Sequence, residues 1–335
     1  MRIALYSPNF YPLTGGLEHM VAYMAQAFAE RGHEVVVICQ TPANGSGNAF
    51  AFRVLRRAGF WREWRALRWA EVVLMFNVSL KALPVVLLSG RPLVVSHQTP
   101  HTPDRLGRWK TQVARRIAHR NVCCSAHLAA QLGAPAVVIP NAYDEQTFCN
   151  RQPWVFRERD LAFVGRLVSD KGADVLLHAL RRLHDRGLAL RLSIIGQGPE
   201  ETVLHHLAAT LGLSKWVVFE GLKQGPELAT LLNHHRVLVV PSVWPEPFGI
   251  VALEGLACGC VVVASDVGGL PEALGGLGAL FPPGDAGALA DVLARIWERP
   301  FDFLPPAERV AAHLSAHTRS TVAERYVAVL SEIRG

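Results

Sequence analysis

The chain contains 335 residues, of which 50% are hydrophobic, and its formal net charge at pH 7 is +6. This length indicates two domains, because single hydrophobic cores stop growing at roughly 250–300 residues. The sequence has no uninterrupted apolar run of about 18 residues, the length that a membrane-spanning helix needs. The apolar run Ile3–Leu5 is too short for a signal peptide, so we expect a cytoplasmic protein.

The positive charge is concentrated in the first half of the chain. Residues 1–150 contain 16 Lys and Arg against 8 Asp and Glu, whereas residues 151–335 contain 18 against 20. A basic half favours an acidic partner, such as anionic lipid, a phosphorylated acceptor or nucleic acid. We set nucleic acid aside because the sequence contains no recognised nucleic-acid-binding module.

Short apolar runs alternate with helical stretches along the whole chain. The strands expected in the first half are Ile3–Ser7, Val35–Cys39, Phe52–Leu55, Val72–Phe76, Leu93–Ser96, Val122–Ser125 and Val137–Pro140. Those expected in the second half are Leu161–Val164, Leu190–Ile195, Val217–Glu220, Val237–Pro241, Val261–Ser265 and Ala279–Phe281. Helices are expected at Glu18–Arg31, Ala173–Arg186, Glu200–Leu211 and Gly287–Glu298, and Ala307–Arg334 has apolar positions at helical spacing. Most of the strands are continuously apolar, which is typical of parallel sheets covered by helices on both faces.

The alternation occurs in two series, which predicts two doubly wound α/β domains in tandem. We expect a first Rossmann-like domain over residues 1–150, a second over 151–306, and a C-terminal helical segment over 307–335 that packs back toward the first. Open α/β sheets bind ligands at the carboxyl ends of their strands. The site is therefore expected in an interdomain cleft that faces those ends.

Two loops that follow expected strands have features of anion-binding sites. Gly15 and Gly16 precede the first helix, where backbone amides can approach a phosphate, although a glycine turn before a helix is also a common structural device. Arg166 and Lys171 follow the first strand of the second half. Their guanidinium and ammonium groups suit a diphosphate, but the same pattern fits two solvated surface cations.

A third loop, Pro241–Gly249, ends a strand and opens a helix. It presents Glu246 at the carboxyl end of the strand, and Glu254 follows within the helix among apolar neighbours. A carboxylate is costly to bury unless it binds something, and sugar hydroxyls can donate hydrogen bonds to it. The backbone amides of Phe248 and Gly249, at the expected start of the helix, suit a phosphate. The alternative is a helix-capping Glu followed by a peripheral Glu.

In this order and spacing, the motifs resemble those of the GT-B glycosyltransferases of family GT4, which are retaining enzymes. The resemblance covers nearly the whole chain and implies the GT-B fold, with two tandem Rossmann-like domains, parallel sheets and an interdomain cleft. It rests on Gly15–Glu18, Arg31–Val35, Ile139–Asn141, Val164–Arg166, Asp170–Gly172, Ile195–Pro199, the pair Glu246 and Glu254, and Ser265–Glu272.

The resemblance implies roles for the matching positions. Arg166 and Lys171 bind the donor diphosphate and stabilise the leaving group, Glu246 contacts hydroxyls of the transferred sugar, and Glu254 binds the ribose hydroxyls. His97 occupies the place of an active-site histidine, with nearby His101 as a rival and a plain loop histidine as the alternative. The remaining donor-binding positions are Gly15, Gly16, Gly221, Leu222, Lys223, Pro247, Phe248, Gly249 and Ile250.

The reaction implied is transfer of a hexose-type sugar, with retention at the anomeric carbon, from a nucleotide-diphosphate sugar to a glycan or lipid-linked acceptor. UDP is the favoured nucleotide, with GDP and ADP left open, and the products implied are lipopolysaccharide, capsule or glycolipid. No metal or other cofactor is expected, because Arg166, Lys171 and helix N-termini can neutralise the diphosphate and the sequence has no Asp-x-Asp motif. Front-face attack and a covalent intermediate both stay open.

The segment Arg53–Trp69 combines six arginines with three tryptophans. Such a segment suits the anionic inner face of the cytoplasmic membrane, which would make the protein a peripheral one. The alternative is that Phe60, Trp64 and Leu67 pack inward while the arginines are merely solvated.

Two other functions fit a chain of this kind. A UDP-GlcNAc 2-epimerase-like isomerase also binds a nucleotide sugar between two Rossmann-like domains, but Glu246 and Glu254 favour transfer. A non-catalytic sugar-nucleotide-binding subunit is disfavoured because Arg166 and Lys171 are present together with those two acids.

Overall fold

A computed structural model describes residues 1–13, 15–43, 50–100 and 105–334, without the side chains of residues 105–108 and 110. The chain divides into two compact units. The first comprises Met1–Ala142 and His317–Gly335, and the second comprises Tyr143–Ala316. These limits lie 8 and 10 residues from those expected at 150 and 306, so residues 307–316 belong to the second unit and not to a C-terminal segment of the first.

The first unit is built on a seven-stranded sheet in the order β3-β2-β1-β4-β5-β6-β7, in which every pair is parallel. Its strands are β1 (Arg2–Ser7), β2 (Glu34–Cys39), β3 (Arg53–Arg56), β4 (Val72–Phe76), β5 (Leu93–His97), β6 (Arg120–Cys123) and β7 (Val137–Val138). The helices are α1 (Gly16–Glu30), α2 (Phe60–Trp69), α3 (Leu83–Ser89), α4 (Arg105–Ile117), α5 (Ala126–Leu132) and α13 (Arg319–Glu332).

The second unit has a six-stranded parallel sheet in the order β10-β9-β8-β11-β12-β13. Its strands are β8 (Arg159–Val164), β9 (Leu192–Ile195), β10 (Val217–Gly221), β11 (His235–Val240), β12 (Val261–Ser265) and β13 (Ala279–Phe281). The helices are α6 (Ala173–Asp185), α7 (Glu201–Thr210), α8 (Gly225–His234), α9 (Ile250–Ala257), α10 (Leu270–Leu274), α11 (Ala286–Glu298) and α12 (Ala307–Ser315). Three short 3-10 turns, η1 (Trp154–Phe156), η2 (Ser169–Lys171) and η3 (Pro300–Asp302), complete it.

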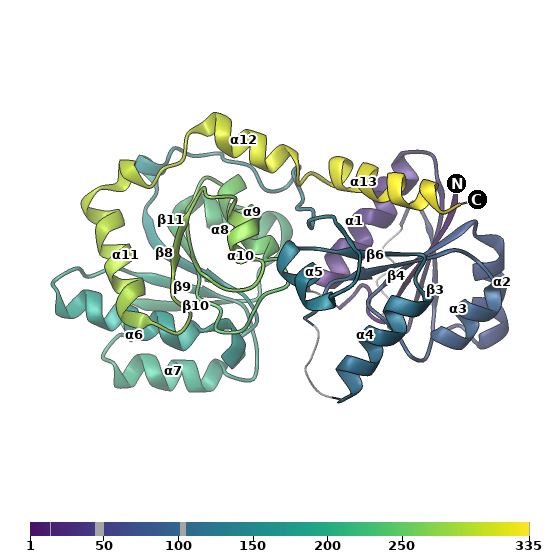
Figure 1. Ribbon diagram of the computed structural model, residues 1–335. Helices are drawn as coiled ribbons and strands as arrows, with labels where there is room; N and C mark the ends of the chain where they lie inside the picture. The colour runs from purple at the N-terminus through teal and green to yellow at the C-terminus, as the bar shows by residue number, and fades with distance from the viewer. Residues whose placement is uncertain (14, 44–49, 101–104, 335) are drawn as a thin grey trace. The chain divides into compact units, whose positions relative to one another are not determined.

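Helices cover both faces of the sheet in the second unit (Figure 1). Apolar side chains of α6, α7 and α11 pack with Phe163, Val237 and Val263 on one face, while α9 contacts β11 and β12 on the other. Strands in such a sheet must be apolar on both sides, and all five residues of β4 and of β12 are buried. The expected architecture, two tandem Rossmann-like parallel sheets, is confirmed.

The C-terminal segment differs from the single helical pattern in the sequence, since it forms two helices, α12 and α13. The chain leaves the helical path after Ser315, and Thr318 caps α13 by accepting a hydrogen bond from the amide of Thr321 at 3.1 Å. Helix α13 packs against α1, and the buried Tyr326 hydroxyl lies 2.8 Å from Ser96 Oγ. The last helix is therefore an integral part of the first unit.

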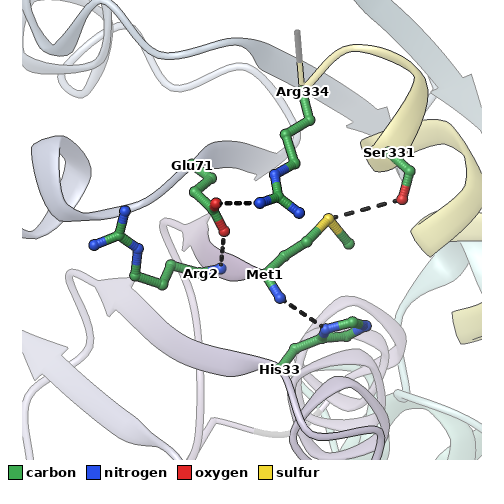
Figure 2. Close-up of polar contacts among 6 residues, drawn as sticks. All are labelled: Met1, Arg2, His33, Glu71, Ser331 and Arg334. Atoms are coloured by element: carbon green, nitrogen blue, oxygen red, sulfur yellow. Dashed lines mark hydrogen bonds and ion pairs between the residues drawn. The ribbon is translucent and has the colours of Figure 1, made fainter.

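A polar network joins residues near both ends of the chain at the amino-terminal ends of the strands of the first sheet (Figure 2). The Glu71 carboxylate accepts hydrogen bonds from the Arg2 amide at 2.7 Å and from Arg334 Nη2 at 2.6 Å. The Met1 ammonium lies 3.1 Å from His33 Nδ1. The hydrogen bond from the Arg2 amide lowers the pKa of Glu71, and the positive charge of Arg334 makes a smaller contribution in the same direction.

Among the described residues, no helix combines the length and the apolarity that crossing a bilayer requires.

Candidate functional site

The predicted anion-binding loops of the second unit lie at the carboxyl ends of adjacent strands. Arg166 and Lys171 lie on the connection between β8 and α6, and Glu246 lies on the connection between β11 and α9. Because β8 and β11 are paired neighbours in the sheet, these connections leave it side by side. The order of elements thus brings a cationic loop next to an acidic one.

A close backbone approach joins the two loops. Gly172, which caps α6, has a φ of +65°, and a methyl group placed on it would lie 2.0 Å from the carbonyl oxygen of Pro241 at the end of β11. The amide of Val243 donates to the carbonyl of Asp170 at 3.0 Å. Only glycine combines this positive φ with the missing side chain that the approach requires.

This approach brings Lys171 into contact with Glu246. The Lys171 ammonium forms an ion pair with Glu246 Oε1, and Ser242 Oγ donates a hydrogen bond to the same oxygen at 2.7 Å. Ser242 is fully buried, while Lys171 and Glu246 are half-buried. Both described donors lie on Oε1, so Oε2 is the Glu246 oxygen available to a ligand hydroxyl.

The backbone around Glu246 is fixed from a second side. The segment Ser265–Glu272 leads from β12 into α10, and within it the Gly269 amide donates to the Glu246 carbonyl at 2.8 Å. Gly249, with a φ of +107°, then opens α9 at Ile250. The Phe248 side chain is buried, so only the backbone of this residue can face a ligand.

Glu254 is a buried acid on α9 with 7% of its surface exposed. Burial, with a smaller contribution from the Asp144 carboxylate, raises the pKa of Glu254 from its ordinary value of 4.5 to about 7. No described residue donates a hydrogen bond to its side chain. A buried carboxylate without such a donor is costly, so the position favours a ligand that supplies hydroxyl donors.

The other predicted positions of this unit are more open. Arg166 is exposed, and the described contacts do not join it to Lys171 or Glu246. Gly221 ends β10, Leu222 is 49% exposed, and Lys223 Nζ lies 3.8 Å from Glu227 Oε2. This stretch lies beside β9, because the Gly196 amide donates to the Gly221 carbonyl at 2.9 Å.

In the first unit, the carboxylate of Glu18 lies beside the predicted glycines Gly15 and Gly16. Gly15 precedes α1, Gly16 is its first residue, and a methyl group on Gly15 would lie 2.6 Å from Glu18 Oε2. Glu18 is 8% exposed, so its carboxylate folds back onto the start of its own helix, where the helix dipole favours negative charge. A phosphate approaching these glycines therefore meets the Glu18 carboxylate.

His97 is the last residue of β5 and is 3% exposed. Its Nε2 lies 3.0 Å from Asn121 Oδ1 on the neighbouring strand β6. An amide oxygen only accepts, so Nε2 is the donor in this hydrogen bond. The rival His101 lies outside the described residues.

Ser242 and Gly269 both hold Glu246 directly, although the sequence motifs predict no role for either. Ser242 follows a strand-ending proline, a placement that a search for side-chain ligands of Glu246 could have used. Within the described ranges, no group of three His, Cys, Asp or Glu side chains is arranged to hold a metal ion.

Comparison with known proteins identifies the family. The model described as "Glycosyl transferases group 1" matches residues 146–311, and the model described as "Glycosyltransferase Family 4" matches residues 14–147. The chain belongs to the group 1 glycosyltransferases of family GT4. The resemblance drawn from the sequence motifs is thereby confirmed, and the isomerase and the non-catalytic subunit are left without support.

Relatives agree with this assignment. An uncharacterized glycosyltransferase of Methanocaldococcus jannaschii is 44% identical over 115 residues, which are 34% of this chain and 29% of that protein. A phosphatidyl-myo-inositol mannosyltransferase of Mycobacterium leprae is 27% identical over 88% of this chain and 87% of its own. The crystal structure of HepE from Anabaena in complex with UDP superimposes with a TM-score of 0.83 at 21% identity, covering 99% of this chain and 100% of that one. The fold is thus that of the GT-B glycosyltransferases.

Proposed function

We propose that the protein is a retaining, metal-independent glycosyltransferase that transfers a hexose-type sugar from a UDP-sugar to a glycan or lipid-linked acceptor. One observation carries this proposal. Lys171 and Glu246 meet at the carboxyl ends of adjacent strands, and the acid Glu254 lies buried on the helix that follows. A cation for phosphate and two acids for hydroxyls are the groups that a sugar nucleotide needs.

In this proposal Lys171 and Glu246 bind different parts of the donor. Lys171 neutralises the diphosphate together with Arg166, which is exposed and able to reach a ligand. Ser242 keeps Glu246 Oε1 in place while Oε2 accepts a hydrogen bond from a hydroxyl of the sugar. The backbone amides of Phe248, Gly249 and Ile250 add donors at the start of α9, because the first amides of a helix lack partners within it. Pro247, which has no amide hydrogen, contributes only its carbonyl and ring.

Glu254 binds the hydroxyls of the ribose in this proposal. Its ionised form accepts hydrogen bonds from both hydroxyls, and these bonds offset the cost of burying the charge. Gly221, Leu222 and Lys223 contact the base from the end of β10. The choice of UDP follows HepE, which has been solved with UDP and with UDP-glucose.

The transfer breaks the bond between the anomeric carbon and the diphosphate oxygen and forms a bond from that carbon to the acceptor oxygen. The acceptor's proton moves to the departing phosphate oxygen. Positive charge fixed before the reaction stabilises the leaving group most, and Lys171, Arg166 and the α9 N-terminus supply it without a divalent ion. The family resemblance adds Gly15, Gly16 and His97 to the proposed donor-binding residues, with His97 assigned to the sugar.

The acceptor is a glycan or a lipid-linked molecule met on the cytoplasmic side of a membrane. Support comes from the mycobacterial relatives named phosphatidyl-myo-inositol mannosyltransferases, which are similar to this chain over most of its length.

A donor screen tests the proposal. Thermal unfolding of the protein is followed with UDP-, GDP- and ADP-sugars, since a ligand that binds the folded state raises the melting temperature. A UDP-sugar should give the largest rise, and transfer to an acceptor should give a product with the donor's anomeric configuration and full rate in EDTA. An inverted product, or activity lost in EDTA and restored by Mg²⁺, would overturn the corresponding part of the proposal.

A further inference from the structure

The solvent-facing side of α2 has an unusual composition. Of the ten residues of this helix, Glu63, Ala66 and Leu67 are buried. The others are all aromatic or arginine: Phe60, Trp61, Arg62, Trp64, Arg65, Arg68 and Trp69. The only acid of the helix, Glu63, is 6% exposed and accepts a hydrogen bond from Gln40 Nε2 at 3.0 Å. The helix thus presents cations and rings to the outside without a negative charge.

For the segment Arg53–Trp69, the sequence left open whether its aromatic residues contact a membrane or pack inward, and the structure answers this residue by residue. Leu67 packs inward, and Trp64 packs partly buried against the core that contains Leu67, as the inward-packing alternative expects. Phe60, in contrast, is 43% exposed, and Trp61 is 69% exposed. That alternative is therefore wrong for Phe60, and large apolar groups remain on the surface.

Helix α3 enlarges the apolar area. Leu87 and Leu88 are 54% and 64% exposed, and the seven residues of α3 include no charged one. Helices α2 and α3 lie next to each other (Figure 1). They are in direct contact, because Trp64 Nε1 donates to the Leu88 carbonyl at 3.3 Å. We name this continuous area the α2–α3 surface, which consists of Phe60, Trp61, Trp64, Leu87 and Leu88 with Arg62, Arg65 and Arg68.

The rings on this surface pack against one another. Phe60 and Trp61 pack edge to face with centroids 5.3 Å apart, and Trp61 and Trp64 do so at 6.1 Å. The Arg68 guanidinium lies 5.8 Å from the centre of the Trp64 ring. The aromatic groups therefore form one cluster with a cation beside it.

Two arginines of the α2–α3 surface, Arg62 and Arg65, also line a groove beside α2. A groove of about 840 Å³ runs between α2 and the strands β2 and β3. Arg53, Arg62 and Arg65 line it together with Trp69, against one acid, Glu34. Guanidinium groups are planar donors that bind phosphate in pairs of hydrogen bonds, so this side of the helix suits anionic headgroups.

We propose that the α2–α3 surface docks the first unit on an anionic lipid bilayer. Trp61, Leu87 and Leu88 enter the interfacial layer, and Arg62, Arg65 and Arg68 bind lipid phosphates. Tryptophan is favoured at the headgroup level, where its ring is apolar and its N–H stays hydrated. A protein partner with a basic face is disfavoured by the charge. The inference rests on the proposed function in one respect, because docking on a bilayer would bring the enzyme to a lipid-linked acceptor.

Co-sedimentation with vesicles tests this inference. Wild-type protein is mixed with vesicles of phosphatidylcholine alone or with phosphatidylglycerol added, at low and high salt. We expect binding to the anionic vesicles that weakens with salt. Because a cation near such a surface contributes about fivefold in affinity, Arg62→Gln/Arg65→Gln should lower binding on the order of twentyfold. Trp61→Ser/Leu88→Ser should lower it at every salt concentration.

Matched controls lie in the second unit. Phe301 is 72% exposed and Arg309 is exposed, so Phe301→Ser and Arg309→Gln remove similar groups elsewhere and should leave vesicle binding unchanged. Circular dichroism of each variant establishes that it folds. Equal binding to neutral and anionic vesicles, or unchanged binding of both double variants, would overturn the inference. So would self-association that these variants abolish in sedimentation velocity, which would assign the surface to a second copy.

The outcome is separable from that of the proposed function. The thermal shift with UDP-sugar reports the donor site in the second unit, whereas vesicle binding reports the α2–α3 surface. Variants of this surface should keep the wild-type response to the donor.

Discussion

Lys171 and Ser242 share a single oxygen of Glu246, although they come from different connections of the second sheet. The shared oxygen fixes the carboxylate and leaves its other oxygen for a ligand. The Lys171 ammonium can then face both the carboxylate and a diphosphate. This arrangement ties recognition of the sugar to stabilisation of the leaving group.

Loss of the Lys171 charge should affect the chemical step. Removing preorganised charge at a leaving group costs about 100-fold or more in turnover. We therefore expect Lys171→Ala to lower kcat at saturating donor by about that factor while the protein stays folded. Lys215→Ala, at an exposed lysine of the same unit, is the control and should be active. A wild-type kcat for Lys171→Ala would remove this residue from the mechanism.

Ser242 should act as a positioning residue for Glu246. Without its hydroxyl, Glu246 Oε1 keeps only the bond to Lys171, and a hydrogen bond to a charged group is worth about 1.5–3 kcal/mol. We expect Ser242→Ala to lower kcat/KM by about tenfold, and Ser242→Thr to restore part of it. Steady-state kinetics with varied donor checks this, and equal losses in the two variants would indicate a packing role instead.

Glu254 should make stability depend on pH. Its pKa is raised from 4.5 to about 7 in the folded protein, so between these values the folded state keeps a proton that the unfolded chain releases. The free energy of unfolding should therefore fall as pH rises from 4.5 to 7, by about 3 kcal/mol at 1.36 kcal/mol per pKa unit.

The measurement is urea unfolding of wild type and Glu254→Gln across this range. The variant lacks the titrating group, so its stability relative to wild type should increase with pH up to about 7 and then level off. A difference that does not change with pH would show that Glu254 titrates normally. Affinity for a UDP-sugar should fall below pH 7 in wild type, because the ribose hydroxyls need the ionised carboxylate.

Gly172 should be far less replaceable than another glycine of similar backbone geometry. Gly172→Ala places a methyl group 2.0 Å from the Pro241 carbonyl at a φ of +65°. Gly187 has a φ of +83° with no atom within 4 Å of the added methyl group, so Gly187→Ala meets only the backbone cost of about 1–2 kcal/mol. We expect thermal unfolding to show a clearly larger loss for Gly172→Ala. Equal losses would mean that the loops at Pro241 and Asp170 are not tightly joined.

The sequence was sufficient for the architecture because buried parallel strands are apolar on both sides. Val72–Phe76 and Val261–Ser265 stand out for this reason and match the structure residue for residue. Strand ends were less predictable, as the expected Val137–Pro140 forms only Val137–Val138. The break before α13 depends on the Thr318 cap, a local signal that the apolar spacing of the segment conceals.

The site was predictable in its residues but not in its contacts. The ends of the strands identify where Lys171 and Glu246 leave the sheet. Their pairing depends on the close approach of Gly172 to Pro241, and no repeating pattern in the sequence reveals that approach. The exposure of Phe60 was equally hidden, because aromatic and arginine residues alternate around α2 and leave the inward face undefined. Burial of Glu254 followed from its apolar neighbours, but the effect of Asp144 needed the fold.

We propose that a nucleotide-sugar donor binds at Lys171, Glu246 and Glu254 of the second unit. Isothermal titration of a UDP-sugar into wild type, Lys171→Ala, Glu246→Ala and Glu254→Ala measures this binding. We expect measurable binding by the wild type and at least about tenfold weaker binding by each variant, which corresponds to about 1.4 kcal/mol. Wild-type affinity in all three folded variants would contradict it.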